Sequence, residues 1–322
     1  MLQEQGSAHR SRSDLLGAAT LVVMWSSGFI GADLGTTYAP AATLLSWRYL
    51  AAGALLAVLF VLTRQCVGRG ALGRQAVLGV LCQCFYLTGV VGGVGLGVPA
   101  GTAALIAALQ PLVVAAHSGP FLGERTTGWQ RAGLVLGIVG VALVVGGDVS
   151  SGSAPWWAYL LPMAGMLSLS GGTVLERRWD PPESLLQTIT LQSITAAGFF
   201  LLVALSRHQV EPPAAGAFWL AVAWVVVLSS FGGYGAYIWV ARSQGATRVS
   251  ALLYLTPAAT MLWAYLMFGD PVTPLGFLGL AVSGTAVILV LGSRPVSAAA
   301  SRERRSARSP RSSRTLPRPR SR

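Results

Sequence analysis

Long apolar runs separated by short polar stretches recur along this chain, up to a C-terminal stretch that is rich in Arg, Ser and Pro. About 20 consecutive apolar residues form a helix about 30 Å long, which matches the hydrocarbon core of a bilayer. The pattern therefore predicts an all-α membrane protein with ten transmembrane helices. The predicted helices cover residues 15–34, 41–63, 75–95, 101–122, 129–146, 156–174, 184–206, 217–241, 249–268 and 274–291.

One stretch of the pattern occurs twice. An apolar run that ends at Gln110-Pro111 returns as a run that ends at Thr256-Pro257, and the offset is 257 − 111 = 146 residues. The two predicted sets of five helices therefore form a duplicated unit. Without any gap, the same offset pairs Phe85 with Phe231, Gly89 with Gly235, Gly123 with Gly269, Glu124 with Asp270, Thr127 with Thr273 and Gly133 with Gly279.

The repeat predicts the domain organisation. We expect a cytoplasmic N-terminal segment at residues 1–14, a first five-helix unit at 15–146, a second at 147–292, and a disordered basic cytoplasmic tail at 293–322. A signal peptide is the alternative for the first apolar run, because Ala39-Pro40-Ala41 resembles a cleavage site. The offset of 146 pairs this run with the one after Trp156, and this favours a membrane helix.

Composition and charge agree with a membrane protein and orient it. Hydrophobic residues make up 53% of the chain and charged residues 11%, which excludes a single water-soluble core. All 23 basic residues are arginine; with a cytoplasmic N-terminus, 21 of them fall in cytoplasmic segments, Arg207 lies outside and Arg48 lies within a helix. Both termini are then cytoplasmic. Since each unit has an odd number of helices, the second unit is expected to be inverted relative to the first.

Several motifs in this chain are similar to those of a known family. Trp25-Ser26-Ser27-Gly28-Phe29-Ile30, Ser46-Trp47-Arg48-Tyr49, the helix with Pro111, and Leu122-Gly123-Glu124-Arg125-Thr126-Thr127 resemble EamA-type members of the drug/metabolite transporter superfamily. The resemblance covers residues 15–292. It implies a ten-helix carrier of the bacterial inner membrane, usually an exporter of amino acids, other metabolites or toxic compounds, with a central cavity between its third, fourth, eighth and ninth helices. Arg48 has no basic counterpart, since 48 + 146 falls on Ile194.

Polar and aromatic side chains near the predicted mid-membrane level are candidates for substrate binding. Polar groups in hydrocarbon are costly, and each needs either a protein partner or a wet cavity. Aromatic side chains suit loose recognition of organic molecules. Packing with a satisfied polar group is the alternative role for each of them. The substrate-binding candidates are Trp25, Tyr86, Gln110, Tyr234, Tyr237, Tyr254 and Thr256, and Gln83 and Gln192 are further polar residues at this level.

Two residues are candidates for coupling or gating. His117 has an unperturbed pKa near 6.5, so it could carry a coupling proton, although a packing role is the alternative. Arg48 lies about 10 Å below the outer end of its helix, where it could line a vestibule or extend to the headgroups. The sequence predicts no carboxylate near the membrane centre, so proton coupling through a central acid has no candidate.

These observations favour a secondary transporter that exports small organic metabolites or drugs by alternating access. The alternatives are a channel-like facilitator and a non-transporting scaffold or sensor that acts through its tail. We expect neither catalysis nor a cofactor: the sequence offers no metal-ligand cluster, and Gly92 to Gly97 follows no predicted strand. Expected partners are a small-molecule substrate and anionic lipids near the tail. The small residues at Gly133 and Gly137 predict close helix contacts, either in a homodimer or within the monomer, and nucleic acid is not expected.

Overall fold

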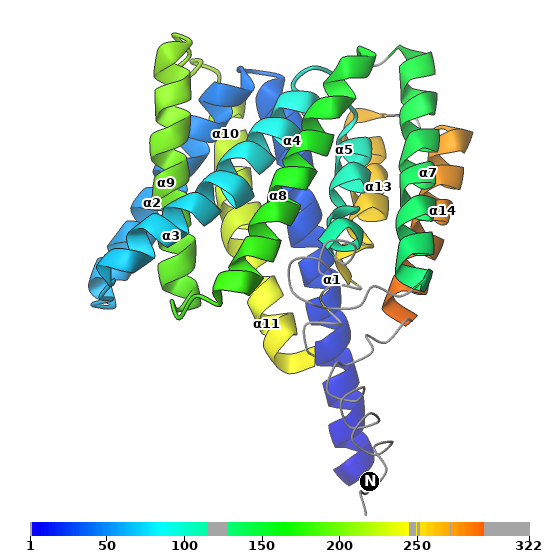
Figure 1. Cartoon of the computed structure of the whole chain (residues 1–322), viewed down its shortest axis with the longest axis horizontal. Coiled ribbons are helices and arrows are strands. Elements are labelled where there is room, and N and C mark those ends of the chain that lie inside the picture. The colour runs from blue at the N-terminus through cyan, green and yellow to red at the C-terminus, as the bar shows by residue number, and fades with distance from the viewer. Residues whose placement is uncertain are drawn as a thin grey trace, which may run out of the picture.

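A computed structural model of the chain describes residues 2–114, 128–152, 154–244, 249, 252–270 and 272–292. These described residues form helices and connecting turns, with no strand among them. The helices are α1 (Leu2–Thr36), α2 (Ala41–Leu62), α3 (Arg69–Gly79), η1 (Val80–Phe85), α4 (Tyr86–Val94), α5 (Ala100–Ala107), α7 (Gly128–Ser151), η2 (Trp156–Tyr159), α8 (Leu160–Trp179), α9 (Leu185–Ser206), α10 (Gly216–Trp224), η3 (Val225–Gly233), α11 (Tyr234–Gln244), α13 (Thr256–Phe268) and α14 (Pro274–Gly292) (Figure 1).

Seven spans in the described part of the chain are long and apolar enough to cross a membrane. This confirms an all-α, multi-pass membrane protein, whereas the count of ten helices stays a prediction. Two further apolar helices, Ala100–Val114 and Pro274–Ala286, are shorter. The seven spans are Leu15–Thr36, Ala41–Leu62, Gly70–Val94, Arg131–Ser151, Trp156–Trp179, Leu185–Ser206 and Gly216–Val240.

The apolar run that ends at Gln110-Pro111 and the one that ends at Thr256-Pro257 are each divided by a turn. After α5, residues 108–109 form a turn, and helical structure resumes at Gln110. Residues 254–255 form the corresponding turn before α13, at an offset of 254 − 108 = 146. Proline has no backbone N–H and its ring displaces the carbonyl four residues earlier, so a helix breaks most easily here.

Two other spans contain a π-helical segment, in which the backbone bonds skip one residue more than in an α-helix. The segment η1 interrupts the third span, and η3 interrupts the span that begins at Gly216. Adding 146 to residues 80–85 gives 226–231, which lies inside η3. Such π-helical segments are rare and occur frequently at functional sites.

Helix packing follows the repeat. Helix α1 packs against η3 and α11, and α8, at the corresponding place in the second unit, packs against η1 and α4. The remaining counterparts pack against each other, as α2 with α9, α5 with α13, and α7 with α14. In Figure 1, α1 rises from the N-terminus whereas α8 descends, and α7 and α14 likewise run in opposite directions. The buried core lies between these pairs and includes Ile30, Leu44 and Phe200.

Small residues of α7 and α14 pack against each other inside the monomer, and the close contact on α7 lies at Gly140, three residues beyond the predicted Gly137. A Cβ built on Gly279 of α14 would overlap the carbonyl oxygen of Gly140 in α7, and a Cβ on Gly140 would lie 2.7 Å from the carbonyl oxygen of Gly279. Ser283 contacts the same glycine of α7. Glycine is therefore required for this close approach between α7 and α14.

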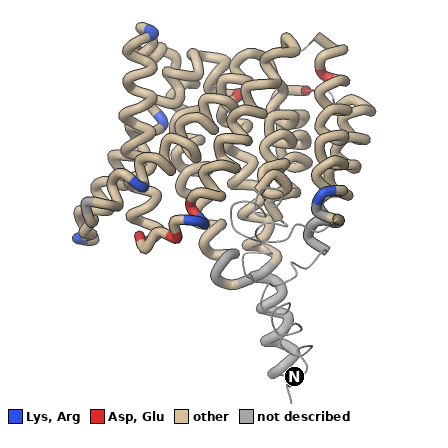
Figure 2. The backbone as a smooth tube through the Cα atoms, in the orientation of Figure 1, with Lys and Arg blue, Asp and Glu red and all other residues tan. Residues whose placement is uncertain are grey.

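The charged residues are distributed unequally between the two ends of the bundle (Figure 2). Arg64 follows the end of α2, Arg131 lies in the first turn of α7, and Arg177 and Arg178 lie in the last turn of α8. These helix ends lie on the same side of the bundle (Figure 1). Arg207 follows the last residue of α9, at the opposite end. The asymmetry agrees with the sequence pattern, and the orientation of the termini stays a prediction.

Candidate functional site

The π-helical segments carry polar side chains to the middle of their spans. Gln83 of η1 lies near the midpoint of Gly70–Val94, and Ser229 and Ser230 of η3 lie near the midpoint of Gly216–Val240. Since 83 + 146 = 229, the two units place polar groups at the same repeat position. Around them gather side chains that we call the central polar cluster: Trp25, Arg48, Tyr49, Gln83, Ser229, Ser230, Tyr234 and Tyr237.

Gln83 uses both ends of its amide, one within the first unit and the other toward the second unit. The Tyr49 hydroxyl donates to Gln83 Oε1 at 2.5 Å, and Gln83 Nε2 donates to the Tyr234 hydroxyl at 3.0 Å. These bonds connect α2, η1 and α11. Because buried polar groups are costly when they lack partners, the amide fixes the positions of both tyrosine hydroxyls.

Three of the predicted binding residues form an aromatic surface within the cluster. The ring centroids of Trp25 and Tyr234 are 5.9 Å apart, with the planes at 67° in an edge-on arrangement. Those of Trp25 and Tyr237 are also 5.9 Å apart, with the planes inclined at 32°. Aromatic rings offer broad apolar area at a small cost in conformational entropy, and the tyrosines add hydroxyls for orientation.

Arg48 brings a positive charge into this cluster. Its side chain is 7% exposed, and its Nη2 donates to Ser230 Oγ at 3.3 Å and approaches Ser229 Oγ at 3.5 Å. The guanidinium carbon lies 5.5 Å from the Tyr49 ring centroid, and its buried Nε has no partner. Arginine stays charged, and an uncompensated charge at mid-membrane costs about 2.5–3.5 kcal/mol or more. Serine hydroxyls cancel none of that charge.

Gly28 of the Trp25–Ile30 motif makes room for one of these hydroxyls. A Cβ built on Gly28 would lie 2.7 Å from Ser229 Oγ. A larger residue would therefore push Ser229 away from the guanidinium of Arg48. The neighbouring residue Ser27 accepts a hydrogen bond at its carbonyl from Trp224 Nε1 at 3.0 Å, which fixes α1 against α10.

The predicted residues beside the prolines lie outside the cluster. Gln110 Nε2 donates to Thr173 Oγ1 of α8 at 3.0 Å. The Thr256 hydroxyl donates to the Leu253 carbonyl at 2.5 Å, which is the carbonyl that Pro257 leaves without its helical partner. Thr256 thus caps the helix break. Ser26 of α1 donates to the Thr256 carbonyl at 3.2 Å and holds that break in place.

The other predicted residues are less closely linked. Tyr86 is the first residue of α4 and is half-buried against the core, and Tyr254 lies in the turn before α13. Their binding roles stay predictions, as do those of Gln110 and Thr256. His117 lies outside the described residues. Sequence reasoning missed Tyr49, Ser229 and Ser230 as site residues, although the 146-residue offset from Gln83 pointed to Ser229.

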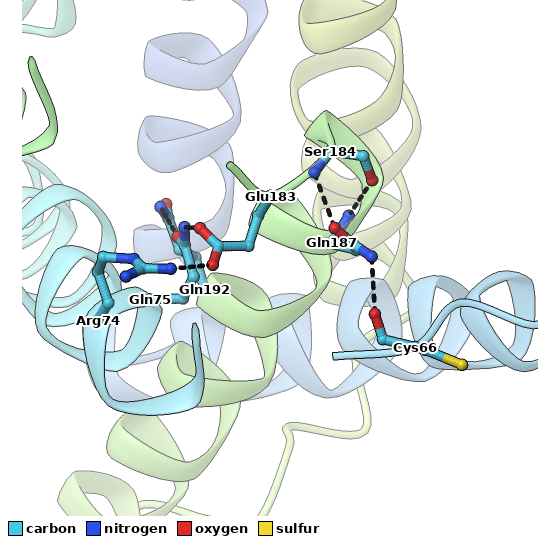
Figure 3. Close-up of polar contacts among 7 residues, drawn as sticks. All are labelled: Cys66, Arg74, Gln75, Glu183, Ser184, Gln187 and Gln192. Atoms are coloured by element: carbon cyan, nitrogen blue, oxygen red, sulfur yellow. Dashed lines mark hydrogen bonds and ion pairs between the residues drawn. The ribbon is translucent and has the colours of Figure 1, made fainter. Parts of the chain in front are cut away.

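A second polar network lies where α3 meets α9 (Figure 3). Arg74 forms an ion pair with Glu183, whose Oε2 accepts a bond from Gln75 Nε2 at 3.0 Å. Gln75, which is fully buried, accepts in turn from Gln192 Nε2 at 3.0 Å. The Arg74 guanidinium beside Glu183 holds the pKa of that carboxyl below its usual range. The predicted mid-membrane residue Gln192 is thereby engaged in packing α9 on α3.

The start of α9 completes this second network (Figure 3). Ser184 and Gln187 form a capping box, in which the Ser184 hydroxyl accepts from the Gln187 N–H at 3.3 Å and the Gln187 side chain accepts from the Ser184 N–H at 2.8 Å. The Gln187 amide also donates to the Cys66 carbonyl at 2.9 Å. These bonds satisfy backbone groups that the first turn of a helix leaves free.

Comparison with known proteins gives consistent matches over the helical region. The model of the EamA-like transporter family matches residues 12–146 and 156–292. The inner membrane transporter YedA of Escherichia coli K12 is 26% identical over 274 residues, covering 84% of this chain and 88% of the relative. A solved crystal structure with 22% identity covers 86% of this chain and 97% of its own, with a TM-score of 0.58, and shows the same fold.

Two relatives carry names that mention a solute. A probable amino-acid metabolite efflux pump of Salmonella typhimurium LT2 is 22% identical over 288 residues, covering 87% of this chain and 93% of the relative. A probable terminal-alkyne amino-acid exporter of Streptantibioticus cattleyicolor is 27% identical over 199 residues, covering 60% of this chain and 64% of the relative.

Proposed function

This chain belongs to the EamA-like transporter family, and from that membership we propose that it exports small organic metabolites, amino-acid-like compounds or drugs, as a secondary carrier. The observation that carries the proposal is the central polar cluster, which both family-matched units supply near the midpoints of their spans. Polar and charged groups at that depth mark substrate paths in membrane proteins. The names of the two relatives support amino-acid-like solutes.

The proposed mechanism is alternating access between two inverted five-helix units, with ten transmembrane helices in all. Three observations support it: the 146-residue offset in breaks and π-helical segments, the packing of counterpart helices, and their opposite directions in Figure 1. Carriers of this architecture bind substrate at the repeat interface and rock one part against the other. The cluster joins α1, α2 and η1 of the first unit to η3 and α11 of the second.

In the proposed topology both termini are cytoplasmic, since the arginine-rich helix ends then face inward. The tail at residues 293–322, which lies outside the described residues, would then meet the inner leaflet. Each of its arginines would be attracted to anionic lipid by about 1 kcal/mol.

The test compares metabolites inside and outside cells that overproduce the protein, the Trp25→Ala variant, or an empty vector. We expect one compound class to leave faster with the intact protein, with saturable kinetics, and efflux to fall about tenfold or more in Trp25→Ala. Tyr265→Ala is the matched control, because it removes an aromatic ring that is 54% exposed on α13. Unchanged fluxes across a broad panel, despite correct membrane insertion, would contradict export.

A further inference from the structure

A buried positive charge in the central polar cluster lacks an anion. Among the described residues, an ion pair joins Arg74 to Glu183, and none joins Arg48 to a carboxylate. The contacts of Arg48 are the two neutral hydroxyls of Ser229 and Ser230 and the ring of Tyr49. Its Nε is buried without a partner, and the residue is 7% exposed. No carboxylate among the described residues pairs with this charge, so an anion from elsewhere would neutralise it.

The charge lies where the two units meet, near the midpoint of a span of the second unit. Arg48 is held against η3 at residues near the midpoint of Gly216–Val240. It therefore does not extend to the headgroups, as long arginine side chains near helix ends commonly do. In a carrier that alternates between two openings, a group at this depth between the units would meet a transported molecule from either side in turn.

Arg48 brings one positive charge to the central polar cluster, and this indicates an anion with one negative charge. Of the other arginines whose side chains the structure describes, Arg74 lies within α3 and is paired with Glu183. The rest lie at helix ends or in loops, and they are Arg64, Arg131, Arg177, Arg178 and Arg207. One guanidinium neutralises one negative charge, whereas a phosphate dianion would leave an uncompensated charge at mid-membrane. The flat fork of arginine donors also matches the two oxygens of a carboxylate.

The side chains around Arg48 indicate which side group the solute carries next to its carboxylate. The Tyr49 ring lies 5.5 Å from the guanidinium carbon of Arg48, and the Tyr49 hydroxyl is linked through the Gln83 amide to the Tyr234 hydroxyl. Tyr234 in turn packs edge-on against Trp25. A carboxylate at Arg48 would thus stand beside aromatic rings, which favour contact with an apolar or aromatic group.

We propose that Arg48 binds the carboxylate of the exported solute, and that the substrates are organic monocarboxylates with an apolar or aromatic side group. This inference rests on the proposed export function and narrows its substrate class. In this arrangement Ser229 and Ser230 orient the guanidinium, Gln83 positions the Tyr234 hydroxyl, and the aromatic rings contact the side group.

The test uses the purified full-length protein in detergent at low ionic strength, with two probes of nearly the same shape. N-acetylphenylalanine is a monoanion, and N-acetylphenylalaninamide is its neutral counterpart. Phenyl phosphate, a dianion, and chloride alone are further probes. A ligand that binds only the folded protein raises Tm as its concentration rises, so the thermal shift reports the apparent Kd. Each probe is applied to the intact protein and to Arg48→Gln, Arg48→Lys and Arg207→Gln.

We expect N-acetylphenylalanine to raise Tm and to bind about tenfold or more tightly than its amide, phenyl phosphate or chloride. Arg48→Gln should lose this preference for the anion, and Arg48→Lys, which keeps the charge without the fork, should retain part of it. Arg207→Gln removes an exposed charge at the end of α9 and should behave like the intact protein.

Equal binding of the anion and its amide, or a preference that survives in Arg48→Gln, would overturn the proposal. Stronger stabilisation by phenyl phosphate or chloride would overturn the monocarboxylate assignment. Efflux of both probes from proteoliposomes separates this proposal from the export function. If N-acetylphenylalanine and its amide leave the proteoliposomes at the same rate, the export function stands and the proposed role of Arg48 is wrong. If binding depends on Arg48 but neither probe is transported, the anion site stands and the export function is wrong.

A variant of Arg48 that fails to elute as a folded monodisperse species is replaced by Ser230→Ala, which should weaken the same preference for the anion.

Discussion

Arg48 and Arg74 carry the same guanidinium into two different surroundings. Arg74 has a side chain that is 29% exposed, and it is paired with Glu183, which Gln75 also contacts. Arg48 is 7% exposed and meets only hydroxyls and a tyrosine ring. Both leave Nε without a partner, so the difference between them is the carboxylate. The charge of Arg74, which the chain itself neutralises, holds α3 against the start of α9, whereas the buried charge of Arg48 is the site that we propose for a solute carboxylate.

The largest expected effect comes from giving Arg48 a partner of its own. In Ser229→Asp a carboxylate would replace a hydroxyl that lies 3.5 Å from the Arg48 guanidinium. We expect the internal pair to raise Tm and to weaken binding of N-acetylphenylalanine about a hundredfold. Ser229→Asn, of the same shape without the charge, is the control. If Ser229→Asp and Ser229→Asn bound N-acetylphenylalanine equally, the missing carboxylate would not explain the difference between Arg48 and Arg74.

A smaller effect is expected at the bridge between the two units. Gln83→Leu leaves the hydroxyls of Tyr49 and Tyr234 without their amide partner, which should lower the free energy of unfolding by about 2 kcal/mol. Gln110→Leu is a matched comparison, because Thr173 would keep its hydrogen bond to the Leu169 carbonyl. Unfolding in increasing concentrations of denaturing detergent measures both. If both variants lost the same free energy of unfolding, the hydrogen bonds of Gln83 in the central polar cluster would contribute no more than the bond of Gln110 beside the helix break.

Removing the carboxylate at the second network should matter less. In Glu183→Gln the partly exposed Arg74 loses its charged partner but gains access to water, so we expect about 1 kcal/mol of destabilisation and unchanged efflux. Glu211→Gln, at an exposed position, should change neither quantity. If Glu183→Gln abolished transport while the protein remained folded, the assignment of this network to structure alone would be wrong.

The smallest effect is the pH dependence of the same pair. The pKa of Glu183 is lowered from 4.5 by the hydrogen bond from Arg74, so the unfolded chain takes up this proton before the folded protein does. The pair therefore stabilises the fold above pH 4.5, and that contribution is lost as pH falls through the lowered pKa. The Tm difference between the intact protein and Glu183→Gln should shrink in that window. A difference that is constant from pH 7 to pH 3 would contradict this reading.

Much of the architecture could be predicted from the sequence. Hydropathy located the membrane helices, because about 20 apolar residues suffice to cross a bilayer whatever their neighbours. The 146-residue offset predicted matching features in both units, and the breaks before Pro111 and Pro257 occur at that offset. The sequence did not predict η1 and η3, because a π-helical segment reflects how a span packs on its neighbours rather than its own composition.

The candidate site was predicted only in part. Trp25, Tyr234 and Tyr237 were expected near mid-membrane from their positions, and the structure brings their rings together. Thr256 was expected to bind substrate, but its hydroxyl caps the carbonyl that Pro257 frees, a contact within one turn of its own run. The proline alone could have predicted that capping. The hydrogen bond from Gln83 to Tyr234 could not be predicted in this way, because it joins residues 151 positions apart.

The sequence by itself determined that the helices are apolar enough for a membrane, that the sequence pattern repeats at an offset of 146 residues, and that one arginine lies within a membrane helix. These properties depend on hydropathy, spacing and residue type along a single segment. The tertiary structure alone decided that Arg74 meets a carboxylate and that Arg48 meets Ser229 and Ser230, which are 181 and 182 residues away. Whether a charge is neutralised depends on which distant segments pack around it, and no local pattern contains that information.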